Sequence, residues 1–106
     1  MYTCYKSGLL STSNQTILTM KPNQFLQISA IWVCEVSGNA DTITLRHTLD
    51  GQSSSSKDDL FSSLAVAANS TTTFTTPIYM KPGDILSAFA STASRVNVSI
   101  YGRMQT

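Results

Sequence analysis

The sequence contains one histidine, His47, and this side chain is the first candidate for proton-transfer chemistry. A catalytic histidine needs an acid, base or nucleophile within hydrogen-bond reach. Apolar residues alternate around it, and the imidazole shares the phase of Ile43, Leu45 and Leu49. The ring should therefore point toward the covered side of a strand. We expect a hydrogen-bonded histidine of the core or of an interface, without a catalytic or ligand-binding role.

The six carboxylates are the second candidates, because a pair of them across a cleft could hydrolyse a glycosidic bond. They are Glu35, Asp41, Asp50, Asp58, Asp59 and Asp84. Their contexts favour turns, since Asp50 precedes a glycine and Asp84 follows a Pro-Gly pair. Asp58 and Asp59 could help to hold calcium, but the spaced oxygen ligands of an EF-hand are missing. We predict no metal site and no enzyme activity, with an unrecognised carboxylate pair as the open alternative.

Nucleophilic and cofactor chemistry has no recognisable motif in the sequence. No serine stands in a Gly-x-Ser-x-Gly elbow, and no glycine-rich phosphate loop occurs. Cys4 and Cys34 lack the short spacing of zinc ligands. The two cysteines could form a disulfide, but without an export signal we expect two reduced, buried thiols. We therefore predict that the protein uses no cofactor.

Aromatic side chains remain as candidates for a binding surface. Trp32 falls in the apolar phase of a central run, which favours core packing over ligand stacking. Tyr79 and Tyr101 fall on outward faces, where a tyrosine is typical of a contact with a partner protein. Together with Tyr2 and Tyr5 near the N-terminus, they are the residues that we predict for partner contact.

The bulk composition narrows the classes of partner. The 106 residues suffice for one domain, and 12% of them are charged, half the usual share of about 25%. A net charge of +1 provides no basic field for nucleic acid. No apolar stretch reaches the roughly 20 residues of a membrane helix, and the N-terminus lacks the layout of a secretory signal. We expect an untargeted product that binds neither nucleic acid nor membranes.

Apolar residues alternate through most of the chain, which indicates β-strands. In residues 26–34 the even positions are apolar, but Ile31 and Val33 lie in the other phase, so both faces should be partly covered. In residues 41–49 the face opposite His47 should be wet. That face carries Thr42, Thr44, Arg46 and Thr48. Near the C-terminus, the apolar phase of residues 95–101 consists of Val96, Val98 and Ile100.

The tripeptide Met-Lys-Pro occurs twice, at residues 20–22 and 80–82, each time before an apolar run. Proline presets φ at the second position of a turn, and Asn23 or Gly83 tolerates the positive φ that a type II turn needs at the third. Both copies therefore predict the same tight turn, at two hairpin-like corners between strands. Further turn signals occur at residues 37–39, 50–51, 68–70 and 91–94.

The remaining segments complete a picture of short strands between turns. Residues 52–59 contain a serine run and predict an exposed loop, whereas residues 58–64 fit one helical turn or an irregular edge strand. The turn spacing predicts an all-β, single-domain antiparallel β-sandwich, jelly-roll-like, with about eight strands. We assign residues 1–15 to an N-terminal arm or edge strand and residues 16–106 to the β-sandwich domain.

Three stretches together resemble small β-sandwich structural proteins of tailed-bacteriophage virions. They are SGNADTITL (37–45), MKPGDIL (80–86) and RVNVSIYG (95–102). The shared pattern is a strand, a small polar turn, a Thr-rich strand, a Pro-Gly-Asp turn and a terminal strand that ends near glycine. The resemblance covers the chain from about Thr16 onward, and the first fifteen residues match no pattern.

The resemblance implies a non-enzymatic virion component, foremost a capsid decoration or cement protein that binds as a symmetric homo-oligomer such as a trimer. A neck, tail or fibre accessory protein is the first alternative. A lectin-like module that binds carbohydrate through Tyr79, Tyr101 or Trp32 is the second. The implied partners are other virion proteins, and the implied location is the virion after synthesis in the host cytoplasm. Residues 1–10 are the leading candidate for a strand or arm that reaches another subunit.

Overall fold

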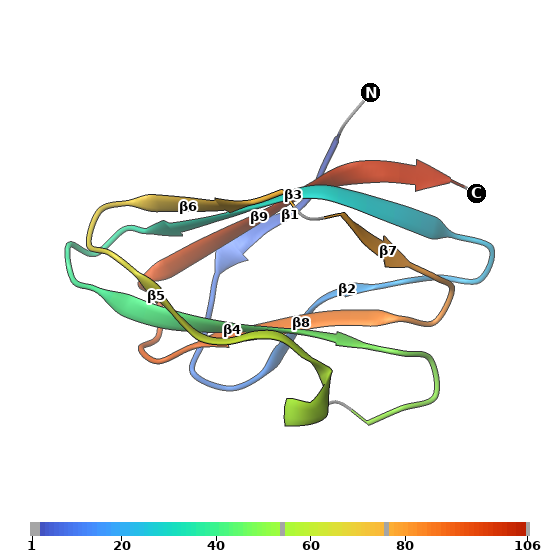
Figure 1. The fold of residues 1–106 in the computed structure, drawn as a ribbon, viewed down its shortest axis with the longest axis horizontal. Coiled ribbons are helices and arrows are strands. Elements are labelled where there is room, and N and C mark those ends of the chain that lie inside the picture. Colours follow the sequence, from blue (N-terminus) through green and yellow to red (C-terminus); the bar gives the residue numbers. More distant parts are fainter. Residues whose placement is uncertain (1–2, 54, 76, 106) are drawn as a thin grey trace.

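The structure is a computed structural model that describes residues 3–53, 55–75 and 77–105. These residues form nine strands and one short 3₁₀ helix, arranged as two layers of antiparallel sheet (Figure 1). Sheet A has the order β1 (Thr3–Leu9), β9 (Val96–Gln105), β3 (Phe25–Glu35), with β6 (Thr71–Phe74) and β7 (Ile78–Met80) along the other side of β3. Sheet B has the order β2 (Gln15–Thr19), β8 (Ile85–Ala90), β4 (Asp41–Thr48) and β5 (Asp59–Val66). The helix, η1 (Ser56–Asp58), leads into β5.

The order of the strands is that of a jelly roll. β6 and β7 pair with successive parts of β3, so they act as one interrupted strand. Counted in this way, the described strands nest in pairs: first with last, second with seventh, third with sixth, and fourth with fifth. Such nested antiparallel pairing folds into two packed sheets. The predicted all-β sandwich of jelly-roll type is therefore confirmed.

The core lies between the two sheets and consists mainly of aliphatic side chains from the inner faces. Its buried members include Leu26, Ile28, Ile31, Val33, Ile43, Leu45, Val66, Leu86, Val96, Val98 and Ile100. In β9 the three residues of the predicted apolar phase are all buried. The strand alternation near the C-terminus is thus confirmed.

Both Met-Lys-Pro turns form as predicted, with Asn23 at φ 65° and Gly83 at φ 86°. In each, the N–H of the fourth residue donates to the lysine C=O, at 3.2 Å in residues 21–24 and 3.1 Å in residues 81–84. The turns are not hairpins. One carries the chain from sheet B to sheet A, between β2 and β3, and the other carries it back, between β7 and β8.

The two turns also meet at one end of the sandwich. The N–H of Met20 donates to the C=O of Asp84 at 2.9 Å, and the N–H of Gly83 donates to the C=O of Met20 at 3.0 Å. The side chains of Met20 and Met80 are both buried. The repeated tripeptide therefore builds two proline-fixed corners that close the same end of the core.

Of the stretch 58–64, Asp58 ends η1 and residues 59–64 belong to the edge strand β5, the second of the two predicted alternatives. β5 is irregular, because its pairing with β4 shifts register twice and Ser63 has φ 51°. The Ser63 N–H donates to the Thr44 hydroxyl at 3.0 Å and so keeps a partner at the irregularity. Such bulges keep an edge strand from pairing with another chain.

The wet face predicted for residues 41–49 is wrong. Thr44 and Thr48 are buried, whereas Leu49, predicted to face the covered side, is 58% exposed. Leu49 follows the last residue of β4, where strand alternation no longer fixes its direction. The two buried threonines have hydrogen-bond partners, the Ser63 N–H for Thr44 and Asp58 for Thr48.

The two cysteines lie outside the core. Cys4 and Cys34 do not form a disulfide with each other, as predicted. Cys4 is exposed and Cys34 is half-buried, so the prediction of buried thiols is wrong. Within the described ranges, no helix has the length and apolar character needed to span a bilayer.

Candidate interaction surface

A one-residue shift in the pairing of β3 with β9 decides which side chains of β3 face solvent. The pairing passes from Ile28 to Ala30 and leaves Ser29 as an extra residue, as in a β-bulge. Before the shift the even positions of β3 are buried, and beyond it the odd positions are buried. Trp32 therefore points outward and is 48% exposed. The predicted core position of Trp32 is wrong for this reason.

Gly102 of β9 makes room for this irregularity. A Cβ atom at position 102 would lie 2.4 Å from the carbonyl oxygen of Gln27 and 3.1 Å from the Cα of Ile28. A side chain there would push the two central strands of sheet A apart. Gly102 thus permits the close approach next to the bulge, and the bulge turns Trp32 toward solvent.

Trp32 and Tyr101 form the centre of the outer face of sheet A. Their ring centroids lie 6.1 Å apart with an interplanar angle of 63°, an edge-to-face contact. Trp32 pairs across the strands with Thr73 of β6 and Ser99 of β9, both small hydroxyl residues. A shallow hollow lies over the two rings and is lined by Ser29, Ala30, Trp32 and Tyr101.

Further exposed side chains continue this surface toward the Met-Lys-Pro end. Gln27 pairs across the strands with Tyr79 of β7 and Arg103 of β9. Tyr79 is 63% exposed, and Phe25 lies beside Gln105 in a second hollow. We call the whole surface the aromatic face. Its members are Phe25, Gln27, Trp32, Tyr79, Tyr101 and Arg103.

The four tyrosines predicted for partner contact lie in different situations. Tyr79 and Tyr101 are both on the aromatic face, where strand alternation places them. Tyr5 belongs to β1, the edge strand beside β9, but its side chain is not described. Tyr2 lies outside the described residues. The structure therefore brings two of the predicted tyrosines to one surface and adds Trp32, which contacts Tyr101, to the same face.

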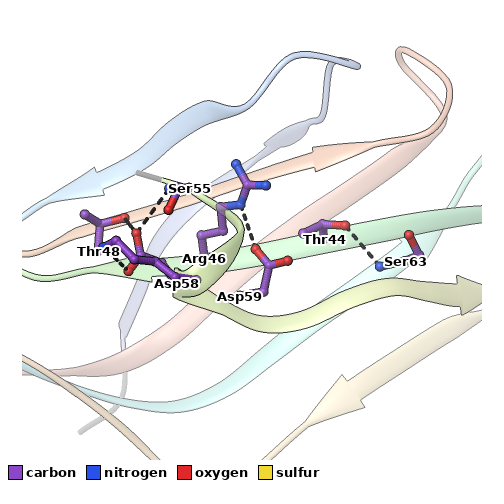
Figure 2. A network of polar contacts seen from close by, with 8 residues as sticks. Thr44, Arg46, Thr48, Ser55, Asp58, Asp59 and Ser63 are labelled. Atoms are coloured by element: carbon purple, nitrogen blue, oxygen red, sulfur yellow. Dashed lines mark hydrogen bonds and ion pairs between the residues drawn. The ribbon is translucent and has the colours of Figure 1, made fainter. Parts of the chain in front are cut away.

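A network of polar contacts joins β4 to β5 and to the η1 segment at sheet B (Figure 2). The Nε of Arg46 donates to Asp59 Oδ1 at 2.7 Å, and the guanidinium carbon lies 5.0 Å from the centroid of the Phe89 ring. The Thr48 hydroxyl donates to Asp58 Oδ2 at 3.1 Å, and the Ser55 N–H donates to the same oxygen at 3.2 Å. Thr44 and Thr48 of β4 are both buried, and each has a hydrogen-bond partner beside this network.

Asp58 and Asp59 therefore serve different partners and do not share a site. Burial opposes ionisation of Asp58, but hydrogen bonds from Lys57, the Ser55 N–H and Thr48 outweigh it and lower the pKa of the carboxyl. Among the described residues, no group of three or more histidine, cysteine or acidic side chains could hold a metal ion. The side chains beside the serine loop thus fasten η1 and β5 to β4.

His47 is a hydrogen-bonded histidine on the inner side of β4, opposite Leu86, as predicted. Its Nε2 lies 2.9 Å from Asp84 Oδ2, and the Asp84 carboxylate also accepts from the N–H groups of Lys81 and Asp50, both at 3.1 Å. Burial opposes ionisation of Asp84, but these three hydrogen bonds outweigh it and lower its pKa. The cluster ties β4 to the second Met-Lys-Pro turn.

Glu35, at the end of β3, is 1% exposed and holds the turn that follows it. It accepts from the Ser37 hydroxyl at 2.6 Å and from the backbone N–H groups of Ser37, Gly38, Asn39 and Asn69. Burial alone would raise the pKa of Glu35, but these donors lower it to about 2. The carboxylate is saturated with donors and acts as the organiser of two loops.

Comparison of the sequence with models of known protein families and with curated proteins gave no match.

Proposed function

We propose that this protein is a non-enzymatic virion structural protein, a capsid decoration protein that attaches to the particle through the aromatic face. The observation that carries the proposal is the outward position of Trp32 at the centre of sheet A, half-exposed beside Tyr101. Tryptophan, tyrosine and arginine are the residues that dominate binding energy at protein interfaces. The aromatic face presents all three types on one sheet.

The character of the surrounding residues supports a protein partner. The neighbours of the two rings are Thr73, Ser99 and Ala30, which are small and uncharged. A partner surface could therefore contact the rings without stripping water from buried charges, which costs binding energy. The rigid antiparallel sheet holds the rings in place, so little side-chain entropy is lost on binding.

The resemblance to small sandwich proteins of tailed-bacteriophage virions supplies the class of partner: capsid proteins, with neck or tail proteins as the alternative. A symmetric homo-oligomer such as a trimer belongs to the same proposal. It would place several aromatic faces on one particle site, and multivalent attachment raises the overall affinity without new contacts.

The proposal is tested by measuring how tightly the Trp32→Ala variant binds to particles that lack the protein. Trp32→Ala should lower binding to particles that lack the protein by at least about thirtyfold, as expected for a residue worth about 2 kcal/mol. Leu49→Ala, a change at an exposed apolar residue away from the aromatic face, is the matched control and should bind normally. Absence of the protein from purified particles by mass spectrometry would reject the virion role.

Carbohydrate binding is the second candidate, and the exposure of Trp32 is the observation that favours it. An exposed indole can stack on a sugar ring, and Gln27 and Arg103 lie on the same face as hydrogen-bond donors. A glycan array separates the two candidates. Glycan binding that Trp32→Ala abolishes would favour this one, and an array without hits would exclude it.

A further inference from the structure

A cavity between the two sheets lies apart from the aromatic face. It has a volume of about 260 Å³ and opens at the side of the sandwich where β5 and the interrupted strand of β6 and β7 form the sheet edges. Its described lining consists of Ile31, Leu45, Leu60, Phe61, Phe74 and Ile78. All six are hydrocarbon side chains, so the cavity offers no described hydrogen-bonding side chain.

The cavity follows from the irregular strands on both sides of it. β5 shifts register twice against β4, and sheet A has an interruption between Phe74 and Ile78. Neither edge can therefore close tightly over the core. The rings of Phe61 and Phe74 bridge the two sheets, stacked with centroids 4.6 Å apart and an interplanar angle of 15°. Leu60, 44% exposed, is the accessible member of the lining.

We propose that this cavity binds a compact, uncharged hydrocarbon ligand, about the size of a substituted benzene ring. An apolar cavity of about 150 Å³ lined by leucine, isoleucine and phenylalanine is large enough for benzene. The cavity here is larger, at about 260 Å³. Water gains no hydrogen bond from the lining side chains, so displacing it by an apolar ring is favourable. A ligand with a charged or strongly hydrogen-bonding group would lose its hydration without compensation.

The test is titration of the protein with toluene and with phenol, followed by methyl NMR of the isoleucine and leucine residues. Toluene should shift the Ile31, Leu45 and Ile78 methyl signals and raise the Tm, whereas phenol should bind at least about tenfold more weakly because its hydroxyl finds no partner. Toluene binding that leaves the Leu45 and Ile78 methyl signals unchanged, or equal affinity for phenol, would overturn the proposal.

Leu60→Trp is the blocking variant, because a larger side chain at this exposed position can fill the mouth of the cavity while leaving the core sequence unchanged. It should weaken toluene binding at least about tenfold. Leu49→Trp places the same side chain at an exposed leucine outside the lining and should bind toluene as the unmodified protein does. Equal loss in both variants, or loss in neither, would contradict the assignment of the site.

Discussion

The two outer faces of the sandwich are built from similar sequence patterns and end in opposite states. On sheet B, Arg46 lies over the Phe89 ring and binds Asp59, and Thr44 and Thr48 are buried. On sheet A, Trp32 and Tyr79 are exposed, and the cross-strand neighbours of Trp32 are Thr73 and Ser99, which are too small to cover the indole. A long charged side chain with a partner closes a sheet face, whereas short hydroxyl neighbours leave aromatic rings available. The contrast supports the proposal that sheet A is the face that contacts a partner.

The largest expected effect concerns the packing that underlies sheet A. Gly102→Ala should lower the free energy of unfolding by about 3 kcal/mol, because the new Cβ would overlap the backbone of β3. Gly8→Ala is the matched control, since a Cβ at Gly8 would meet nothing within 4 Å. Urea unfolding of both variants measures the difference. Equal stabilities would show that the close approach of β3 and β9 is unimportant.

The next largest effect is expected when the Arg46–Asp59 ion pair of sheet B is removed. Arg46→Ala should cost about 2 kcal/mol of stability, the range for a hydrogen bond between charged groups with little exposure. Arg103→Ala, at an exposed arginine of the aromatic face, should change stability by less than about 0.5 kcal/mol. Thermal unfolding of the two variants makes the comparison. A similar loss in both would remove the distinction between the two faces.

The stability of the loops at the end of β3 should depend on pH, because the buried Glu35 carboxylate holds them. The pKa of Glu35 is lowered from 4.5 to about 2 in the folded protein, so its contribution to stability is complete above pH 4.5 and is lost as the pH falls toward 2. Ser37→Ala removes one donor and should move this acid loss to higher pH. Denaturant titrations between pH 2 and 6 measure the shift. An unchanged profile in Ser37→Ala would contradict the assigned role of the hydroxyl.

The smallest effect on stability is expected at Trp32 itself. Trp32→Ala should cost about 1 kcal/mol, the value of an edge-to-face aromatic contact, because the indole is already half-exposed. Trp32 is the single tryptophan of the sequence, so fluorescence quenching by acrylamide reports its exposure directly. Efficient quenching in the folded protein, and protection from it in a complex, are the expected results. An indole shielded from acrylamide in the isolated protein would contradict the exposed position of Trp32.

The class of fold and the corners could be predicted because they depend on local signals. Alternating apolar residues and the Pro-Asn and Pro-Gly turns act within a few positions of each other, and β9 and both Met-Lys-Pro turns formed as predicted. The phase of Trp32 depends instead on an extra residue, Ser29, and on the space left by Gly102, far away in the sequence. One signal was present: beyond Ala30 the more strongly apolar residues stand at odd positions.

The printed sequence by itself determined a β-sandwich with two proline-bearing corners, because side-chain period and turn chemistry are properties of neighbouring residues. The tertiary structure decided which residues face outward, since a bulge reverses the phase of β3 and the hydroxyls of Thr44 and Thr48 are buried against Ser63 and Asp58. Strand pairing between distant segments fixes both outcomes. For that reason the aromatic face and the apolar cavity are visible only in the packed sheets and could not be predicted from the order of residues along the chain.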